Sequence, residues 1–286
     1  MTAYEISDLP QKDFPEGLIY IPQAPKRLRI AGTIPTDSTF LCVVGSRKYS
    51  SYGAEVCEKL ITGLKGLPVV IVSGLALGID SIAHKSALKA GLKTVAFPAS
   101  GLSVKTIYPR NHLQLAEQIV ESGGALISEF DDDFRAALWS FPRRNRLMAG
   151  ISKAVLIVEA GPKSGTLITA RLATEYNRDV FAVPGNISSP LSQGPNMLIR
   201  LGATPITKQE DLLEALGFEQ QEGRTKNLFE DLDENERKVA ELLIEPLTRD
   251  ELAERASLPQ NQISIILSML EIKGVVKESG GKIYLV

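Results

Sequence analysis

The sequence predicts an α/β protein, with an extended Rossmann-like, doubly wound and mostly parallel sheet and a small C-terminal winged-helix domain. Three observations predict this fold. Short apolar runs alternate with helix patterns over residues 39–217, Gly-rich turns follow several of these runs, and the C-terminal part shows three helix patterns and a hairpin. Parallel neighbours require crossover connections, so strand–helix alternation favours a parallel sheet.

The composition permits a larger and a smaller folded domain. The chain has 286 residues, of which 44% are hydrophobic and 23% charged, so it can bury a full core. No stretch approaches the roughly 20 apolar residues of a membrane helix. The polar start, residues 1–11, lacks the charged and apolar regions of a signal peptide. We therefore expect a cytoplasmic protein without a membrane partner.

Residues 1–38 contain five prolines and little periodicity, which predicts an N-terminal extended arm lying against the domain. The basic run at residues 25–29 is interpreted as a solvated surface segment.

Residues 39–217 form the predicted Rossmann-like domain. Six apolar runs are typical of strands buried on both faces: 40–44, 69–72, 94–97, 125–127, 154–158 and 180–183. The helix patterns between and after them cover residues 54–65, 81–90, 112–121, 144–150, 167–176, 196–201 and 208–216.

A polar, Gly-containing stretch at residues 218–226 is a predicted linker. Residues 227–286 then show helix patterns at 234–243, 249–256 and 260–273, followed by a hairpin over 275–286, which is the winged-helix order.

The net charge of −2 conceals a difference between the two parts. Residues 1–224 carry a net charge of +2, whereas residues 225–286 carry −4. Binding of a polyanion is therefore expected in the larger part, and there it must be local.

Metal sites and histidine-based catalysis are not indicated. Cys42 and Cys57 lack paired zinc spacing, and His84 and His112 are the only histidines, so all four are interpreted as structural. The run 131–133 of three aspartates suggests either a metal site or a solvated loop, and we favour the loop because consecutive residues cannot all face one ion. We expect no cofactor.

Three Gly-rich turns at the carboxyl ends of predicted strands have the composition of a phosphate site. Gly45, Ser46 and Arg47 offer close backbone approach, a hydroxyl and a guanidinium. Gly74 to Gly78 precede Asp80, which is placed to N-cap the next helix. The third turn, residues 161–166, opens another helix. Neither glycine pattern fits a dinucleotide fingerprint or a P-loop, so neither NAD nor ATP is expected.

Phe141 to Arg146 is the stretch densest in arginine, and Trp139 and Phe141 are the rings that flank its arginines. Tyr108 and Arg110 offer another ring and cation ahead of a different helix. Cations for phosphates and rings for bases are what single-strand binding requires. In the alternative interpretation, Trp139 and Phe141 cap the core and the arginines pair with acids such as Asp131.

At these motifs the sequence resembles the DprA/Smf family of DNA-processing proteins. The matching segments are Gly-Ser-Arg at 45–47, Ser-Gly-Leu-Ala-x-Gly-Ile-Asp at 73–80, Tyr-Pro-x-x-Asn/His at 108–112, Phe-Pro-Arg-Arg-Asn-Arg at 141–146, Lys-Ser-Gly-Thr-Leu-Ile-Thr-Ala at 163–170 and Val-Pro-Gly at 183–185.

The resemblance implies a homodimer that binds single-stranded DNA, loads the RecA recombinase during natural transformation and displaces single-strand-binding protein, without being an enzyme. Two departures stand out: only a short arm precedes the Rossmann-like part, and the stretch 130–140 has no counterpart that we recognise. The expected DNA-binding residues are Ser46, Arg47, Gly74, Gly78, Asp80, Arg110, Phe141, Arg143, Arg144, Asn145, Arg146, Lys163, Ser164, Gly165 and Thr166.

Two other functions remain open. A nucleotide-binding or phosphoribohydrolase-like protein resembling the plant LOG enzymes would need a catalytic Glu where Thr169 stands. A transcription factor would read duplex DNA with the helix at 260–273, which carries no cation before Lys273. A protein-contact or regulatory role is the expectation for the winged helix.

Overall fold

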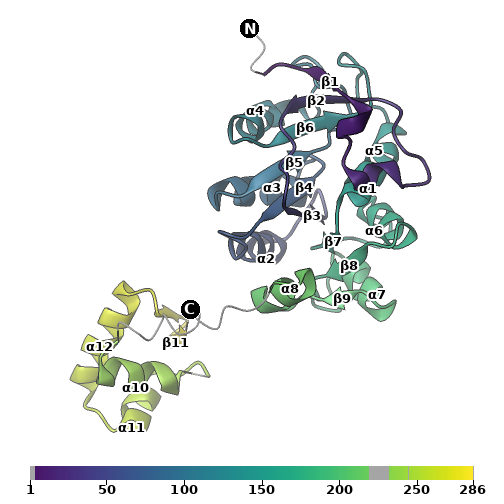
Figure 1. The fold of residues 1–286 in the computed structure, drawn as a ribbon. Helices are drawn as coiled ribbons and strands as arrows, with labels where there is room; N and C mark the ends of the chain where they lie inside the picture. The colour runs from purple at the N-terminus through teal and green to yellow at the C-terminus, as the bar shows by residue number, and fades with distance from the viewer. Residues whose placement is uncertain (1–3, 219–231, 244, 286) are drawn as a thin grey trace. The chain divides into compact units, whose positions relative to one another are not determined.

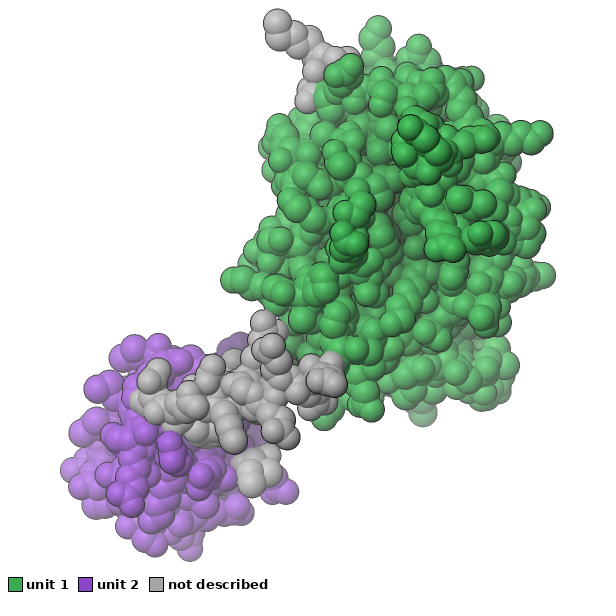
Figure 2. All heavy atoms as spheres, viewed as in Figure 1, with its two compact units in different colours: residues 1–219 green, residues 220–286 purple. Residues whose placement is uncertain are grey.

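The structure is a computed structural model that describes residues 4–218, 232–243 and 245–285. The predicted linker, residues 218–226, lies outside the described residues except for its first. The chain forms two compact units, residues 1–219 and 220–286 (Figures 1 and 2).

Unit 1 is organised around a nine-stranded sheet with the order β1-β2-β6-β5-β4-β3-β7-β8-β9 (Figure 1). From β6 through β9 in this order, neighbouring strands pair in parallel, whereas β1 and β2 pair antiparallel. The predicted doubly wound, mostly parallel sheet is confirmed. Its strands are β1 (Ser7–Leu9), β2 (Leu28–Gly32), β3 (Thr39–Val44), β4 (Val69–Ser73), β5 (Lys93–Ala96), β6 (Ala125–Ser128), β7 (Ala154–Ile157), β8 (Asp179–Ala182) and β9 (Thr204–Pro205).

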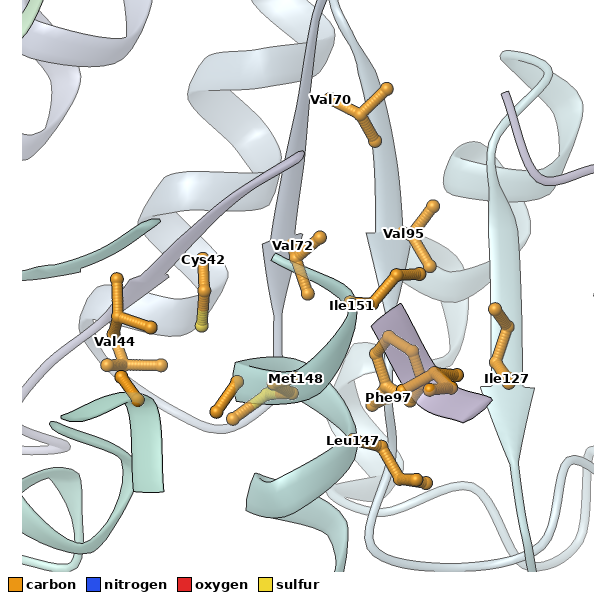
Figure 3. Packing of buried hydrophobic residues seen from close by; sticks show 14 of the residues in the cluster. Cys42, Val44, Val70, Val72, Val95, Phe97, Ile127, Leu147, Met148 and Ile151 are labelled. Carbon is orange, nitrogen blue, oxygen red and sulfur yellow. The ribbon is translucent and has the colours of Figure 1, made fainter. Parts of the chain in front are cut away.

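Alternating side chains of each central strand enter two different cores. In β3, Leu41 and Val43 pack with helices α2 (Ser51–Thr62), α3 (Ile79–Lys89) and α8 (Gln209–Leu216) on one face. Cys42 and Val44 pack on the other face, where Figure 3 shows Met148 of α5 (Ser140–Ile151) among the strand residues. The two-residue period of a strand thus explains why these runs are apolar throughout.

The remaining helices complete the two layers. The first face also carries α4 (Leu113–Glu121), and the second carries α1 (Glu16–Ile19) and α6 (Thr166–Glu175). The helix α7 (Gln193–Arg200) follows β8 along the chain.

The chain leaves β3 toward β4, β5 and β6, and then returns to β7 on the other side of β3. The order of strands therefore reverses between β3 and β7. In open α/β sheets, such a reversal opens a crevice at the carboxyl ends of the strands, where ligands bind.

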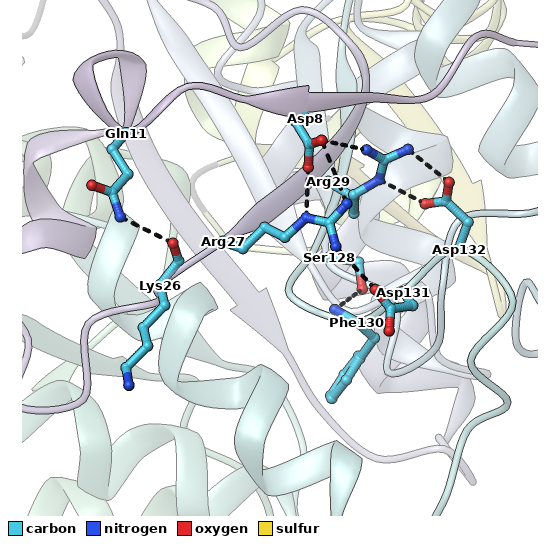
Figure 4. A network of polar contacts seen from close by, with 9 residues as sticks. All are labelled: Asp8, Gln11, Lys26, Arg27, Arg29, Ser128, Phe130, Asp131 and Asp132. Carbon is cyan, nitrogen blue, oxygen red and sulfur yellow. Dashed lines mark hydrogen bonds and ion pairs between the residues drawn. The ribbon is translucent and has the colours of Figure 1, made fainter.

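The segment expected as an extended arm contributes two strands to the sheet. Its basic residues are also not merely solvated: Arg29 forms ion pairs with Asp132 at 2.7 Å and Asp8 at 3.0 Å, and Arg27 pairs with Asp8 at 2.7 Å and Asp131 at 3.1 Å (Figure 4). Asp131 and Asp132 therefore serve as counter-ions, which corrects the expectation of a simply solvated acidic loop.

Unit 2 consists of α10 (Glu234–Leu242), α11 (Arg249–Ala256), α12 (Gln260–Ile272) and the antiparallel hairpin β10 (Val276–Ser279) and β11 (Lys282–Leu285). Capping boxes begin α10 and α11, with Asp233 paired to Glu236 and Thr248 to Glu251. Apolar residues of all three helices and the hairpin share one core, so the predicted winged helix is confirmed.

Candidate nucleic-acid interface

A cavity of about 590 Å³ lies at the crevice between the turns that leave β3 and β7. Helix α5 forms another part of its wall. The lining residues are Val44, Gly45, Ser46, Arg47, Lys48, Ala76, Asp80, Phe141, Arg144, Asn145, Met148, Gly161, Pro162, Lys163, Ser164, Gly165, Thr166, Thr169 and Leu191. A cavity of this volume lies within the range of small-molecule sites.

Close backbone contact holds the first two turns together. A Cβ atom at Gly45 would lie 2.6 Å from a side-chain carbon of Ile79, and one at Gly78 would lie 2.3 Å from the carbonyl oxygen of Ser46. The Ile79 N–H donates to that same oxygen at 3.2 Å. Gly78 has φ of +85° and is the N-cap of α3. Gly78 therefore shapes the wall without lining the cavity.

Arg47 is exposed and lies against an aromatic ring. Its guanidinium carbon is 4.8 Å from the centroid of the Phe141 ring, within the range of a cation–π contact. Phe141 is half-buried and meets Tyr108 edge to face, with centroids 5.8 Å apart. Among the described residues, none forms an ion pair with Arg47. Its charge is therefore available to a ligand.

Arg144 is a buried cation at the cavity wall. It is 5% exposed and donates from Nη1 to the carbonyl oxygen of Phe97 at 2.6 Å, while its buried Nε has no hydrogen-bond partner among the described residues. Gly74 makes room for it, since a Cβ there would lie 1.6 Å from Nη1. Burial lowers the pKa of Arg144, and attraction to Asp80 opposes that shift. A lining cation that forms no ion pair with any described residue favours an anion at this wall.

Asp80 holds the second turn in place. The sequence predicted Asp80 as the helix N-cap, but Gly78 takes that position, and this prediction was wrong. Asp80 is the second residue of α3, and its side chain accepts a hydrogen bond from the Gly74 N–H at 3.1 Å. Burial raises the pKa of Asp80, with Arg144 opposing the shift.

The third turn is tied to the other walls. Thr166 Oγ1 donates to the carbonyl oxygen of Gly45 at 3.1 Å, and Asn145 Nδ2 donates to that of Gly165 at 3.5 Å. Ser164 Oγ accepts from the Thr166 N–H at 3.2 Å. Lys163 is exposed at the rim.

Not every arginine of the 141–146 block reaches the cavity. Phe141, Arg144 and Asn145 line it, whereas Arg143 and Arg146 bind Glu129 on another face of α5. The distance from Arg143 Nε to Glu129 Oε1 is 3.1 Å. The expected wall of three cations is thus corrected to one buried cation and a ring, because successive helical residues point about 100° apart.

Two further expected residues stand outside the main cavity. Gly74 lines a small adjoining hollow with Tyr108 and Phe141. Arg110 lines neither space, and its guanidinium donates to the carbonyl oxygen of Val104.

Sequence reasoning missed Glu129 as the partner of Arg143 and Arg146, and only the alternative interpretation paired the arginines with acids, such as Asp131. One signal was present: Glu129 directly follows the apolar run that became β6, so it lies at the same sheet edge as the arginine block. Among the described residues, no helix combines the length and apolar character that a membrane span requires.

Comparison with known proteins agrees with the sequence motifs. The model of the family described as DNA recombination-mediator protein A matches residues 6–217, and that of the DprA winged helix domain matches residues 227–282. Protein Smf of Escherichia coli is 41% identical over 274 residues, covering 91% of this chain and 72% of that protein. DNA processing protein DprA of Bacillus subtilis is 39% identical over 207 residues, covering 72% of this chain and 69% of that protein.

Two solved structures share the fold. DNA processing protein A of Streptococcus pneumoniae superposes with a TM-score of 0.67 at 38% identity, covering 75% of each chain. The protein of the same name from Helicobacter pylori, whose structure concerns its single-stranded DNA binding mode, gives a TM-score of 0.67 at 31% identity, covering 76% of this chain and 98% of that one. Together with the family match over most of unit 1, these similarities show that the chain belongs to the DNA recombination-mediator protein A family, also called DprA/Smf.

Proposed function

We propose that this protein binds single-stranded DNA in the cavity between the β3 and β7 turns. The observation that carries the proposal is a set of cations facing the cavity beside a half-buried ring: Arg47, Arg144 and Lys163 with Phe141. Phosphates need the cations and bases need the ring. The relative from Helicobacter pylori, described for single-stranded DNA binding, supports the same ligand here.

Different lining residues are proposed to bind the phosphates and the bases. Arg47 and Arg144 are proposed to bind phosphate oxygens, because guanidinium groups form two parallel hydrogen bonds to them. Ser46, Lys163, Ser164 and Thr166 lie within the turns around the same space. Phe141 is proposed to stack a base, and Arg47, already above this ring, then lies beside the adjoining phosphate.

Beyond DNA binding, we propose a role as a recombination mediator that loads RecA onto incoming single-stranded DNA during natural transformation, in the cytoplasm and as a homodimer. Family membership supports this role. The test is RecA filament assembly on single-stranded DNA coated with single-strand-binding protein. If filaments form no faster with this protein present, the mediator role is excluded, whereas DNA binding is not.

Hydrolysis of a nucleotide is the less favoured alternative. Thr169 lines the cavity where a phosphoribohydrolase resembling the LOG enzymes needs a carboxylate. Asp80 is the carboxylate among the lining residues, and it is 5% exposed and hydrogen-bonded to the Gly74 N–H. A carboxylate held in this way is poorly placed to take a proton from water or a sugar.

The binding site is tested by replacing its two arginines. Arg47→Ala together with Arg144→Ala should abolish binding of an oligothymidine at low salt, and Arg47→Ala alone should weaken it because Arg47 is exposed and makes no ion pair within the described chain. For each phosphate that a substitution leaves without its arginine, the slope of log affinity against log salt should fall by about 0.7.

The matched control is Arg171→Ala, since Arg171 is a surface arginine of α6 that pairs with Glu175 and does not line the cavity. Fluorescence anisotropy of a labelled oligothymidine gives the affinities, and circular dichroism checks the fold. Unchanged affinity in the double variant would remove the cavity as the DNA site.

A further inference from the structure

A second ring with a neighbouring cation lies at the amino end of α5. Trp139 is the N-cap residue of this helix, and 54% of it is exposed. Phe130 and Phe134 support its ring, with centroid distances of 5.7 Å and 5.3 Å. These two rings are themselves stacked 4.5 Å apart. The indole is therefore held by aromatic contacts while about half of it stays open to solvent.

Arg143 is the cation of this pair. Its guanidinium carbon is 5.9 Å from the ring centroids of both Trp139 and Phe130. The buried carboxylate of Glu129 holds Arg143 Nε at 3.1 Å, yet the Arg143 side chain is 53% exposed. The guanidinium is thus oriented by Glu129 and still reachable from solvent, which lowers the conformational cost of binding a phosphate.

This pair shares the amino end of α5 with the cavity residues Phe141 and Arg144, while Arg143 lies on another face of the helix. Trp139 precedes the cavity residue Phe141 by two positions, and Arg143 precedes Arg144 by one. The first turn of α5 contains no acidic residue, and no side chain caps its amino end. Two ring–cation pairs, Arg47 with Phe141 and Arg143 with Trp139, therefore flank a helix terminus that itself favours negative charge.

We propose that Trp139 and Arg143 form a second subsite for single-stranded nucleic acid, in which the indole stacks a base and the guanidinium binds the phosphate next to it. This inference rests on the proposed function of the cavity and extends it. A strand leaving the Phe141 side crosses the amino end of α5 and meets Trp139. The ring alone would suit any apolar partner, but a ring with an oriented cation, next to a cationic cavity, matches a nucleotide better.

Trp139 is the one tryptophan of the sequence, so intrinsic tryptophan emission reports this subsite directly. The probe is an oligothymidine of about 16 nucleotides, the upper end of common single-strand site sizes. Its binding to the full chain is followed both by the anisotropy of a label on the DNA and by Trp139 emission. The proposal expects emission to be quenched in parallel with the rise in anisotropy.

Substitutions separate stacking from structural support. Trp139→Ala should lower the affinity at least about fivefold, and Trp139→Phe should restore most of it, because stacking on a ring contributes about 1–3 kcal/mol per base. Arg143→Ala should reduce the salt slope by about 0.7. Tyr49→Ala is the matched control, since Tyr49 is an aromatic side chain that is 48% exposed and belongs to neither pair.

The outcomes distinguish this inference from the proposed function. If the oligothymidine raises the anisotropy but leaves Trp139 emission unchanged, and Trp139→Ala binds as tightly as wild type, the subsite is excluded and the cavity stands. Equal losses of DNA affinity in Trp139→Ala and Tyr49→Ala would also overturn the proposed subsite. If wild type shows no anisotropy change, the proposed function itself fails. If Trp139→Ala does not fold, the Trp139 emission of the wild type and the DNA affinity of Trp139→Phe still test whether the subsite exists.

Discussion

Arg144 and Arg146 lie two residues apart on α5 and are both buried, yet their surroundings differ. Arg146 has a full counter-charge in Glu129, which is 4% exposed in its side chain, and also donates to the carbonyl oxygen of Gln23 at 2.5 Å. Arg144 has the carbonyl oxygen of Phe97 but, among the described residues, no carboxylate at ion-pair distance, and the Nε atoms of both arginines lack a hydrogen-bond partner there. The first arrangement stabilises the fold, and the second leaves capacity for a ligand.

The role of Glu129 is testable through stability. Glu129→Gln removes the counter-charge of the buried Arg146, so the free energy of unfolding should fall by about 3–5 kcal/mol. Urea unfolding measures this loss. The control Glu175→Gln breaks the exposed i,i+4 pair with Arg171 and should change the free energy by less than about 0.5 kcal/mol. Equal effects of the two substitutions would show that Glu129 is not a structural counter-ion.

His84 gives a prediction about pH. Burial lowers the pKa of His84 to about 3, and its Nδ1 lies 2.7 Å from Thr94 Oγ1. An unperturbed imidazole has a pKa of about 6.5, so on acidification the unfolded chain binds the proton before the folded one. The stability from neutral His84 is therefore complete above about pH 6.5 and is lost progressively between about pH 6.5 and pH 3.

Urea unfolding at pH 7 and pH 5 should accordingly differ by about 2 kcal/mol through this residue, with the lower stability at pH 5. His84→Gln should remove that part of the difference. An identical difference in the variant would mean that other groups cause it.

At the scale of elements, α5 decides which residues reach the cavity. The sequence predicted a helix over 144–150, but α5 begins at Ser140 and includes Pro142 in its first turn. Proline is tolerated there because the first N–H groups of a helix have no intrahelical partner. The start at Ser140 places the whole 141–146 block on one helix and therefore on more than one of its faces.

The turn after β4 is a second element whose shape controls the site. Gly74→Ala would push a methyl group into the Arg144 guanidinium, which is buried and has little room to move. We expect the free energy of unfolding to fall by about 1–3 kcal/mol and the oligothymidine affinity to fall about tenfold or more, as one charge-assisted contact is displaced.

Gly91→Ala is the matched control for this turn. Gly91 has φ of +72°, and no atom of the described residues lies within 4 Å of an added Cβ, so the substitution costs about 1–2 kcal/mol of strain and leaves the cavity intact. Both variants should lose stability in thermal unfolding, and only Gly74→Ala should lose DNA affinity. A parallel loss of affinity in both would attribute it to stability alone.

At the scale of the molecule, each of the two units has its own core, and the basic and acidic parts of the chain coincide with them. Unit 2 buries residues of α10, α11, α12 and the hairpin together. Its α12 offers Gln260, Asn261 and Gln262 without a cation before Lys273, and Lys273 binds Glu236 at 2.6 Å. Reading of a DNA groove needs phosphate anchoring, so a protein-contact or regulatory role stays the prediction for this unit.

Deletion of residues 225–286 tests this division. Single-stranded DNA affinity should stay within about tenfold of the full chain, because the proposed site lies in unit 1 and unit 1 has its own cores. Anisotropy titrations of both proteins at the same salt concentration give the comparison. A loss larger than this would place part of the DNA site in the winged helix.

The parallel sheet, the winged helix and the three turns around the cavity could be predicted from the sequence, because strand and helix periods and glycine positions are local properties of the chain. The folded structure was needed to show that Arg144 lines the cavity while Arg143 and Arg146 bind Glu129. It also showed that residues 7–9 and 28–32 pair into the sheet. These outcomes depend on contacts between residues far apart in sequence and on the residue at which α5 begins. The local hydrophobic pattern predicts neither.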